Sequence, residues 1–293
     1  MLNHLTFVKN HLLSLQGYYY LFSLLRNPSI SRLNLEHILN SMMPELENAS
    51  SANSSLFDKL LEKRNLKKRR KFDQFHSMSA LVAGLGEYKS ILELNCGNGM
   101  LLAGMAAMLP STIFYGVDIN EKLIAKAKMK YDLPNLDFYV HDIYQGQPDG
   151  NYGLVYSLHG CGNLTDLVID IAVSLNSDVV IIPCCYAKIK RKENQPGSIF
   201  LPRSNVLEAH ASEFRGVILS TAKRLEGSGI EGNNTARSAY LSLARLIVNL
   251  DRVFYLQSNG YQVSLFQLTG EKSGFDQDYH SSGLRLGLVG RKV

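Results

Sequence analysis

The stretch ILELNCGNGM, residues 91–100, decides the fold of this 293-residue chain. An apolar run typical of a strand enters a turn that contains Gly97 and Gly99, and the chain leaves this turn as the helix-like run MLLAGMAAML. Glycines allow the backbone to adopt positive φ and to approach a ligand closely, while the start of a helix offers unpaired N–H donors. The stretch therefore predicts a ligand-binding turn between a strand and a helix.

Short strand-like segments alternate with helix-like segments from Ser90 onwards, a pattern typical of a parallel sheet covered on both faces. Residues 194–235 are rich in Gly, Asn and Ser and predict loops with short helices, followed by an amphipathic helix over Ala236–Leu250 and an antiparallel hairpin over 261–268 and 283–292 at the sheet edge. The expected strands of the parallel part are 90–95, 112–118, 136–140, 152–159 and 178–186, and the expected helices are 99–109, 121–131 and 164–175.

The N-terminal part of the chain has a different pattern. Residues 1–46 show apolar residues at helical spacing and predict two or three helices, the polar stretch 47–55 resembles a linker, and Leu56–Leu85 resumes the helical spacing. We expect a helical N-terminal region over 1–75, followed by an α/β domain over 76–293.

Three acidic residues lie where consecutive strands of the expected sheet end. Glu93 precedes the glycine turn, Asp118 ends the second strand about 20 residues further on, and Asp142 follows the third. An acid at the position of Asp118 can accept hydrogen bonds from ribose hydroxyls, and one at Asp142 can reach an adenine amino group. The alternatives are a solvated strand end for Glu93, a helix cap for Asp118 and an ordinary turn residue for Asp142.

The pattern resembles the class I S-adenosylmethionine-dependent methyltransferases over residues 90 to about 185. In that family an acid precedes the glycine turn, whereas the turn of dinucleotide oxidoreductases has a third glycine, and the corresponding residue here is Leu102. The resemblance implies a Rossmann-like seven-stranded sheet with helices on both faces, a helical N-terminal extension, and S-adenosylmethionine as the cofactor. It implies cofactor contacts from Glu93, Asn95, Gly97, Gly99, Asp118, Ile119, Asp142, Ile143 and His159.

Two further motifs, LHGCGNLTD at 158–166 and PCCY at 183–186, resemble a subgroup of these enzymes. That subgroup includes glutathione S-transferase C-terminal-domain-containing and ribosomal RNA adenine dimethylase domain-containing proteins and, more distantly, tRNA 2'-O-methyltransferases. We expect His159, Cys185 and Tyr186 near the transferred methyl group, with His159 as proton acceptor and Tyr186 stacking on a base or hydrogen-bonding the acceptor. Asp166 is as well placed to hold the turn in shape.

The four cysteines, Cys96, Cys161, Cys184 and Cys185, leave their role open. A covalent nucleophile and a His/Cys metal site are alternatives, but no C-x-x-C spacing is present, and small thiols also pack well beside crowded glycine turns. The number and spacing of the cysteines do not suit a disulfide framework. We also expect neither a signal peptide nor an apolar span of about 18 residues, and these features together favour a cytoplasmic protein.

Basic residues are concentrated in EKRNLKKRRK, residues 62–71, although the net charge is only +5. Such a run attracts phosphates, so the sequence favours RNA as the methylated substrate, while a solvated helix face is the alternative. Protein or small-molecule methylation and a non-catalytic, cofactor-binding scaffold also remain open. The expected RNA contacts are Lys63, Arg64, Lys67, Lys68, Arg69, Arg70, Lys188, Lys190 and Arg191.

Overall fold

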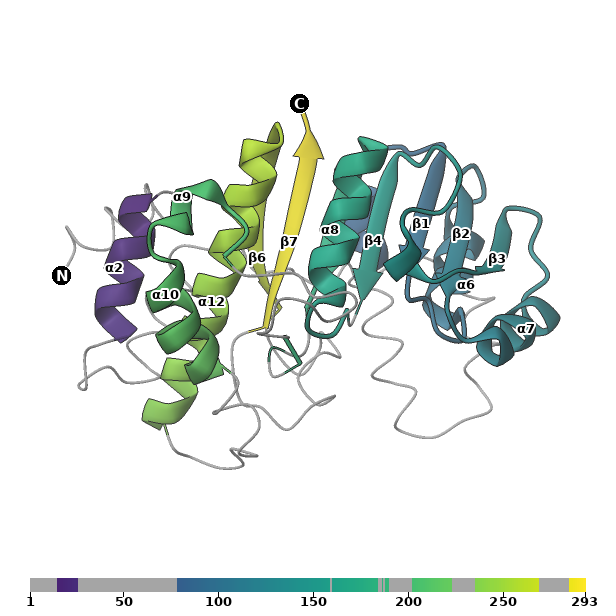
Figure 1. The fold of residues 1–293 in the computed structure, drawn as a ribbon. Coiled ribbons are helices and arrows are strands. Elements are labelled where there is room, and N and C mark those ends of the chain that lie inside the picture. The colour runs from purple at the N-terminus through teal and green to yellow at the C-terminus, as the bar shows by residue number, and fades with distance from the viewer. Residues whose placement is uncertain are drawn as a thin grey trace.

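The computed structural model describes residues 15–25, 78–158, 160–183, 186, 188–189, 202–222, 235–268 and 285–293. Its centre is a seven-stranded sheet in the order β3-β2-β1-β4-β5-β7-β6, shown in Figure 1. The strands are β1 (Ser90–Leu94), β2 (Ile113–Asp118), β3 (Leu136–Val140), β4 (Leu154–Leu158), β5 (Asp178–Ile182), β6 (Tyr261–Leu268) and β7 (Arg285–Lys292).

Strands β1 to β5 are parallel, and β7 pairs antiparallel with both β5 and β6. The strand order reverses between β1 and β4, which are neighbours in the sheet. Open α/β sheets bind ligands at such a reversal, outside the carboxyl ends of the strands. The expected seven-stranded sheet and its terminal antiparallel hairpin are confirmed.

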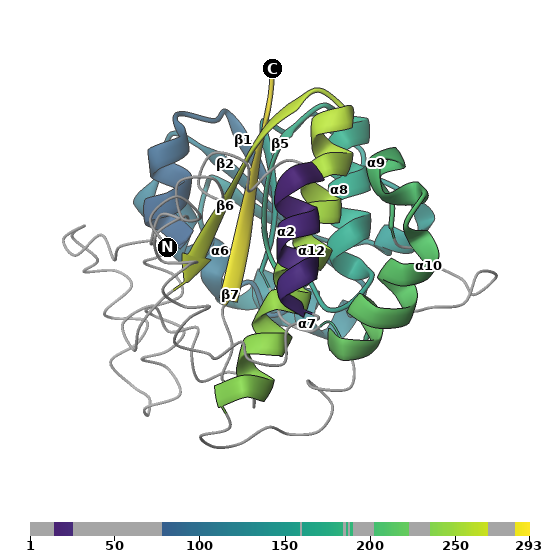
Figure 2. The same cartoon turned by 90° about the vertical axis from the view of Figure 1, so that its left-hand side faces the viewer.

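Helices cover both faces of the sheet, as the sequence predicts, and Figure 2 shows α6 on one side and α2, α8 and α12 on the other. Helix α12 continues eight residues beyond the predicted end at Leu250, because Val253, Phe254 and Leu256 keep its apolar face buried. The helices are α2 (Leu15–Leu25), 78–85, α6 (Met100–Met108), α7 (Glu121–Lys130), 3-10 helix η1 (Ile143–Gln145), α8 (Leu164–Leu175), α9 (Asn205–Glu208), α10 (Ala211–Glu213), π-helix η2 (Phe214–Leu219) and α12 (Thr235–Ser258).

Alternation along the strands divides the apolar side chains between two cores. Ile91 of β1 faces the core that contains Leu102 of α6, whereas Leu92 and Leu94 face the core that contains Ile169 of α8 and Ile247 of α12. Because both faces of the central strands β4 and β5 are buried, their sequences are nearly continuous apolar runs rather than alternating ones.

Several sequence predictions lie outside the described residues. They are the helices expected before residue 15 and over 26–46, the linker at 47–55, most of the helix expected over 56–85, the boundary at 75/76, and parts of the expected loops at 194–201 and 223–234. Within the described range 202–222, the short helices α9, α10 and η2 agree with the loops and short helices predicted for that region.

Candidate active site

The turn after β1 alternates between ordinary and left-handed backbone. Asn95, Gly97 and Gly99 have φ of 62°, 59° and 69°. The backbone N–H of Gly99 donates to the carbonyl of Cys96 at 3.0 Å, which closes the turn just before α6 begins. A Cβ on Gly99 would lie 2.3 Å from the ring of Phe138, whereas one on Gly97 would meet no atom within 4 Å. The turn is thus closely packed behind Gly99 and open in front of Gly97.

Asp118 ties this turn to the end of β2. One carboxylate oxygen accepts a hydrogen bond from the backbone N–H of Gly97 at 2.9 Å, and the other accepts one from the N–H of Asn120 at 2.9 Å. The side chain of Asn120, not that of Asp118, caps α7 by accepting from the N–H groups of Lys122 and Leu123. A carboxylate has about four lone-pair sites, so Asp118 retains acceptor capacity for a ligand. The adjacent Ile119 is 61% exposed and offers apolar surface beside it.

Asp142 follows β3 and serves as the N-cap of η1. Its carboxylate accepts a hydrogen bond from the N–H of Tyr144 at 3.0 Å, and Ile143 is buried behind it. This geometry agrees with the turn role given above as the alternative. A contact with an adenine amino group remains a prediction, because the capping bond occupies only part of the acceptor capacity of the carboxylate.

Glu93 is 3% exposed and lies opposite Tyr156 of the neighbouring strand β4. Burial, and then the negative charge of Glu93, raise the pKa of the Tyr156 phenol. Burial, followed by the charges of Glu93 and Asp118, also raises the pKa of the Cys96 thiol far above its ordinary value. Since the reactive form of cysteine is the thiolate, this raised pKa disfavours Cys96 as a nucleophile near neutral pH.

The two cysteine-containing motifs follow neighbouring strands. Leu158 at the end of β4 pairs with Ile182 at the end of β5, so the turns that follow start side by side. Gly162, with φ of 61°, packs against the backbone of Lys188, where a Cβ would lie 2.6 Å from the carbonyl carbon. The turns therefore touch, although His159, Cys184 and Cys185 lie outside the described residues and their proposed roles remain predictions.

Tyr186 is 3% exposed, and its hydroxyl accepts a hydrogen bond from the Asn249 amide at 2.7 Å. The guanidinium groups of Arg245 and Arg252 lie 5.4 and 5.7 Å from the centre of its ring. A buried ring in this setting is a structural anchor, so direct contact of Tyr186 with a substrate base stays a prediction that the geometry does not favour.

Asp166 has the structural role that the sequence suggested as an alternative to a direct one. It is fully buried and accepts two hydrogen bonds from Arg252, at 2.9 and 3.0 Å. Asn163 occupies the N-cap position of α8 without a side-chain capping bond to the helix. Thr165, in the first turn of α8, donates to the carbonyl of Gly160 at 2.5 Å and so ties the turn after β4 to the helix.

The sequence reading missed the polar residues Asn249 and Arg252 of α12, which contact these motifs, and their neighbour Asp251, which accepts from Arg203 and Ser204 instead. The signal was present as NLDR, residues 249–252, between the apolar runs 246–248 and 253–256 of the helix. Polar residues on a buried helix face need polar partners. Their partners could not be named from the sequence, because they lie more than 45 residues away along the chain.

A second feature that the sequence reading missed is a cavity of about 490 Å³ on the α8 side of β2 and β3. The rings of Tyr115 and Tyr139 are stacked with centroids 6.1 Å apart, and Tyr152 meets Tyr115 edge-on at 5.4 Å. The chain between β3 and β4 contains only the three-residue η1, so within the described part of the chain this connection places no long helix over the sheet. The remaining lining residues are Val140, His141, Gln147, Pro148, Asp149, Gly150 and Asn151.

The residues around the first turn fit an adenosylmethionine cofactor. Among the described residues, the buried side-chain N–H group of Asn95 has no hydrogen-bond partner. The space before Gly97 is open, Asp118 has spare acceptor sites, and Ile119 offers an apolar side chain. Together with the Asn95 donor, these features suit a nucleoside that carries an amino acid. The described residues contain no cluster of three metal-ligating side chains, and His159, Cys184 and Cys185 are not among the described residues.

With this geometry in place, part of the chain is similar to a known family. Residues 69–192 match the family model described as "Methyltransferase domain".

Known relatives share parts of the chain. A glutathione S-transferase C-terminal domain-containing protein of Xenopus laevis is 22% identical over 264 residues, 84% of this chain and 39% of the relative. Malonyl-[acyl-carrier protein] O-methyltransferase 1 of Ilyobacter polytropus is 31% identical over 81 residues, 27% of this chain and 30% of the relative. The chain thus spans well under half the length of these relatives.

Solved structures with a similar chain trace include the methyltransferase domain of bacterial CtHen1, with a TM-score of 0.46, 13% identity, and coverage of 78% of this chain and 100% of that one. The plantazolicin methyltransferase BpumL in complex with SAH has a TM-score of 0.42 and 14% identity, and the match covers 82% of this chain and 90% of that one. Among the described residues, no helix is long and apolar enough to cross a membrane.

Proposed function

We propose that the chain is an S-adenosylmethionine-dependent methyltransferase that acts on RNA. The observation that carries the first part is the turn after β1, held to Asp118 beside the point where the strand order reverses, within a segment that matches a methyltransferase domain. The proposal of RNA as acceptor depends on the basic run at 62–71.

In this proposal the residues of the first turn bind the cofactor, which supplies an electrophilic methyl group. Asp118 accepts hydrogen bonds from the ribose hydroxyls, Ile119 contacts the adenine ring, and Asn95 donates to the amino-acid part. The buried carboxylate of Glu93 favours the positive charge of the ligand, since an opposite charge in a poorly solvated site is strongly attracted. His159 is assigned as the proton acceptor, because a neutral imidazole accepts a proton near neutral pH.

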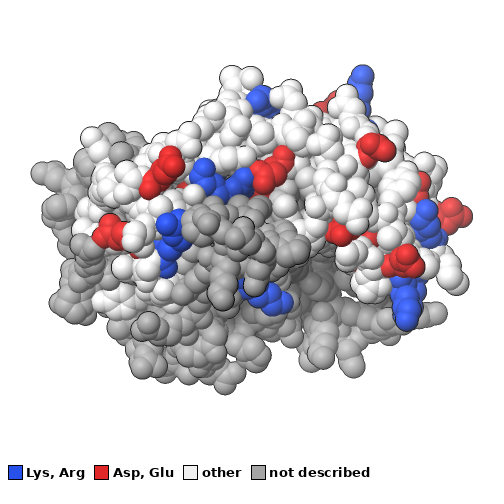
Figure 3. Space-filling view, viewed as in Figure 1, with Lys and Arg blue, Asp and Glu red and all other residues white. Residues whose placement is uncertain are grey.

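The proposed acceptor site lies beyond the turns after β4 and β5. Lys188 is exposed next to these turns, and Lys190 and Arg191 follow it in the sequence. Over the face in Figure 3, the described Lys and Arg side chains are interspersed with Asp and Glu and form no single basic patch. The proposal assigns RNA affinity mainly to the run at 63–70, where phosphate contacts would orient the substrate without reading its sequence.

Calorimetric titration with S-adenosylhomocysteine tests the cofactor assignment. We expect a binding isotherm for the full chain and an affinity at least tenfold weaker for Asp118→Asn, which loses the negative charge and one of the two acceptor oxygens. Lys126→Ala, on the exposed surface of α7, is the control and should bind as the unaltered chain does. No heat at millimolar ligand would refute the proposal.

Transfer of tritiated methyl groups into separate RNA, protein and small-molecule fractions identifies the acceptor. We expect label in RNA. Label in protein or small molecules alone would replace RNA with another acceptor, and cofactor binding with no label in any fraction would favour the scaffold alternative.

The contribution of the basic run is tested by RNA affinity as a function of salt. Replacing Lys63, Arg64, Lys67 and Lys68 by Ala should reduce the slope of log K against log salt by about 0.7 for each lost phosphate contact with single-stranded RNA. Lys122→Ala together with Lys126→Ala on α7 is the matched control. An unchanged slope would show that the run does not contact RNA.

A further inference from the structure

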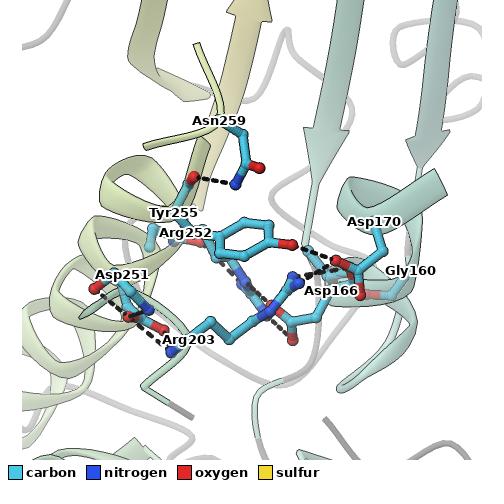
Figure 4. A network of polar contacts seen from close by, with 11 residues as sticks. Gly160, Asp166, Asp170, Arg203, Asp251, Arg252, Tyr255 and Asn259 are labelled. Atoms are coloured by element: carbon cyan, nitrogen blue, oxygen red, sulfur yellow. Dashed lines mark hydrogen bonds and ion pairs between the residues drawn. The ribbon is translucent and has the colours of Figure 1, made fainter. Parts of the chain in front are cut away.

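A buried polar network connects the turns after β4 and β5 to helix α12, as Figure 4 shows in part. Arg252, 1% exposed, donates to both oxygens of Asp166, which lies in the first turn of α8 directly after the LHGCG motif. The same guanidinium donates to the amide oxygen of Asn249 at 3.0 Å. The amide nitrogen of Asn249 in turn donates to the hydroxyl of Tyr186, the last residue of the PCCY motif, at 2.7 Å.

Backbone contacts carry this connection into the turns themselves. Thr165, adjacent to Asp166, donates to the carbonyl of Gly160, and Gly162 packs on the backbone of Lys188, two residues beyond Tyr186. A shift of Asp166 or Tyr186 relative to α12 would therefore move the turn that follows β4 or the one that follows β5.

The turn after β4 borders the point of ligand binding. Strands β1 and β4 are neighbours, the strand order reverses between them, and ligands of such sheets bind outside the carboxyl ends of the strands at that position. The turn with Gly97 and Gly99 forms one side of this position, and the turn with Gly160 and Gly162 forms the other.

The contribution of this network to folding stability does not by itself explain its presence. Burying charged groups carries a desolvation penalty, and replacing a buried ion pair by apolar residues of similar volume is often neutral or stabilising. A network whose members are hydrogen-bonded, in contrast, specifies one geometry. Asn249 serves this purpose well, because its amide donates to one motif and accepts from the arginine that holds the other.

We propose that Asn249 and Arg252 are positioning residues, which fix the turns after β4 and β5 relative to each other and so shape the cofactor and acceptor sites. This inference rests on the proposed function. Neither residue touches the cofactor: Asn249 acts through Tyr186, and Arg252 acts through Asp166.

A pair of substitutions at one position tests the inference. Asn249→Leu has a similar volume and loses both hydrogen bonds. Asn249→Asp keeps an acceptor for Arg252, and its second oxygen can accept from the Tyr186 hydroxyl, which then becomes the donor. We expect the affinity for S-adenosylhomocysteine, measured by calorimetry, to fall at least tenfold in Asn249→Leu and to stay within threefold of the unaltered chain in Asn249→Asp.

Two further variants separate positioning from a general loss of stability. Tyr255→Phe removes the bond from the Tyr255 hydroxyl to Asp170 at the edge of the same network, and its affinity should stay within twofold even where urea unfolding shows a lower stability. Tyr186→Phe combined with Asn249→Leu should bind no more weakly than Asn249→Leu alone, since both substitutions break the same link.

The outcomes distinguish the inference from the proposed function. No heat with the unaltered chain refutes the proposed function. If the unaltered chain binds, then equal affinity in Asn249→Leu, or a loss in Asn249→Asp as large as that in Asn249→Leu, overturns the positioning role. Equal losses in Tyr255→Phe and Asn249→Leu would likewise overturn it, because the effect would then follow stability.

Discussion

At the scale of single residues, the first turn depends on close packing on one side and open space on the other. Gly99 has positive φ and faces the ring of Phe138, so neither its backbone conformation nor its neighbour tolerates a side chain well. Left-handed backbone costs a residue with a Cβ roughly 1–2 kcal/mol.

Gly99→Ala tests this packing. We expect the free energy of unfolding in urea to fall by about 1–3 kcal/mol, because the added methyl group forces Phe138 or the turn to move. The affinity for S-adenosylhomocysteine should fall with it. Gly84→Ala, at a helical position with no atom within 4 Å of the added Cβ, is the control and should be neutral or stabilising. Equal stability of Gly99→Ala and the unaltered chain would contradict this account of the turn.

Cys96 offers a test of the electrostatics beside the same turn. Because burial and the charges of Glu93 and Asp118 raise the pKa of its thiol, its thiolate fraction at pH 8 should be far smaller than that of a free cysteine. Iodoacetamide labelling followed by mass spectrometry should be slow for Cys96 in the folded chain and normal in guanidinium chloride. Glu93→Gln removes one negative charge, so it should lower the pKa and speed the labelling. Rapid labelling of the unaltered folded chain at pH 8 would contradict the prediction.

At the scale of elements, the β6–β7 hairpin at one end of the sheet contains a cross-strand pair of a glycine and a phenylalanine. Gly287 of β7 lies directly opposite Phe266 of β6, and a Cβ on Gly287 would lie 2.0 Å from the phenyl ring. The ring thus covers the backbone of β7, which is the strand between β5 and β6.

Gly287→Ala should lower the free energy of unfolding by about 1–3 kcal/mol through this overlap. Combining it with Phe266→Leu should cost less than the sum of the two single substitutions, because the smaller side chain leaves room for the methyl group. Strict additivity of the two effects in urea unfolding would show that the ring does not occupy the space above Gly287.

The sequence predicted the elements well because their signals are local. The alternation of apolar strands with amphipathic helices gave β1 to β5, α6, α7 and α8, and the two apolar runs at the C-terminus gave the antiparallel pair. The sequence predicted that Asp118 lies beside the glycine turn, because the motif fixes the spacing between them. The cofactor contacts expected from these residues remain predictions.

Long-range features could not be predicted in the same way. The partners of Arg252 and Asn249 lie 86 and 63 residues away along the chain, so their pairing depends on how α12 packs on α8. The tyrosine-lined cavity depends on the absence of a long helix between β3 and β4, which leaves Tyr139 partly exposed. Neither feature produces a periodic pattern or a motif.

At the scale of the whole molecule, the described N-terminal helix is part of the main core. Tyr18, Leu21 and Phe22 of α2 are buried in the same apolar cluster as Leu246 and Ile247 of α12. The hydroxyl of Tyr19 is 2.5 Å from the imidazole of His210, which follows α9. Helix α2, which belongs to the expected N-terminal region, therefore packs in the same core as α12.

Leu21→Ala tests whether α2 contributes to the stability of the domain. A buried leucine truncated to alanine typically costs 2–5 kcal/mol, and since Leu21 is fully buried we expect a loss in that range. Gln16→Ala, at an exposed position of the same helix, should change the free energy of unfolding by less than about 0.5 kcal/mol. Urea unfolding followed by circular dichroism should show a single transition in both variants. A second transition that leaves the sheet intact, or an unchanged midpoint in Leu21→Ala, would mean that α2 folds apart from the domain.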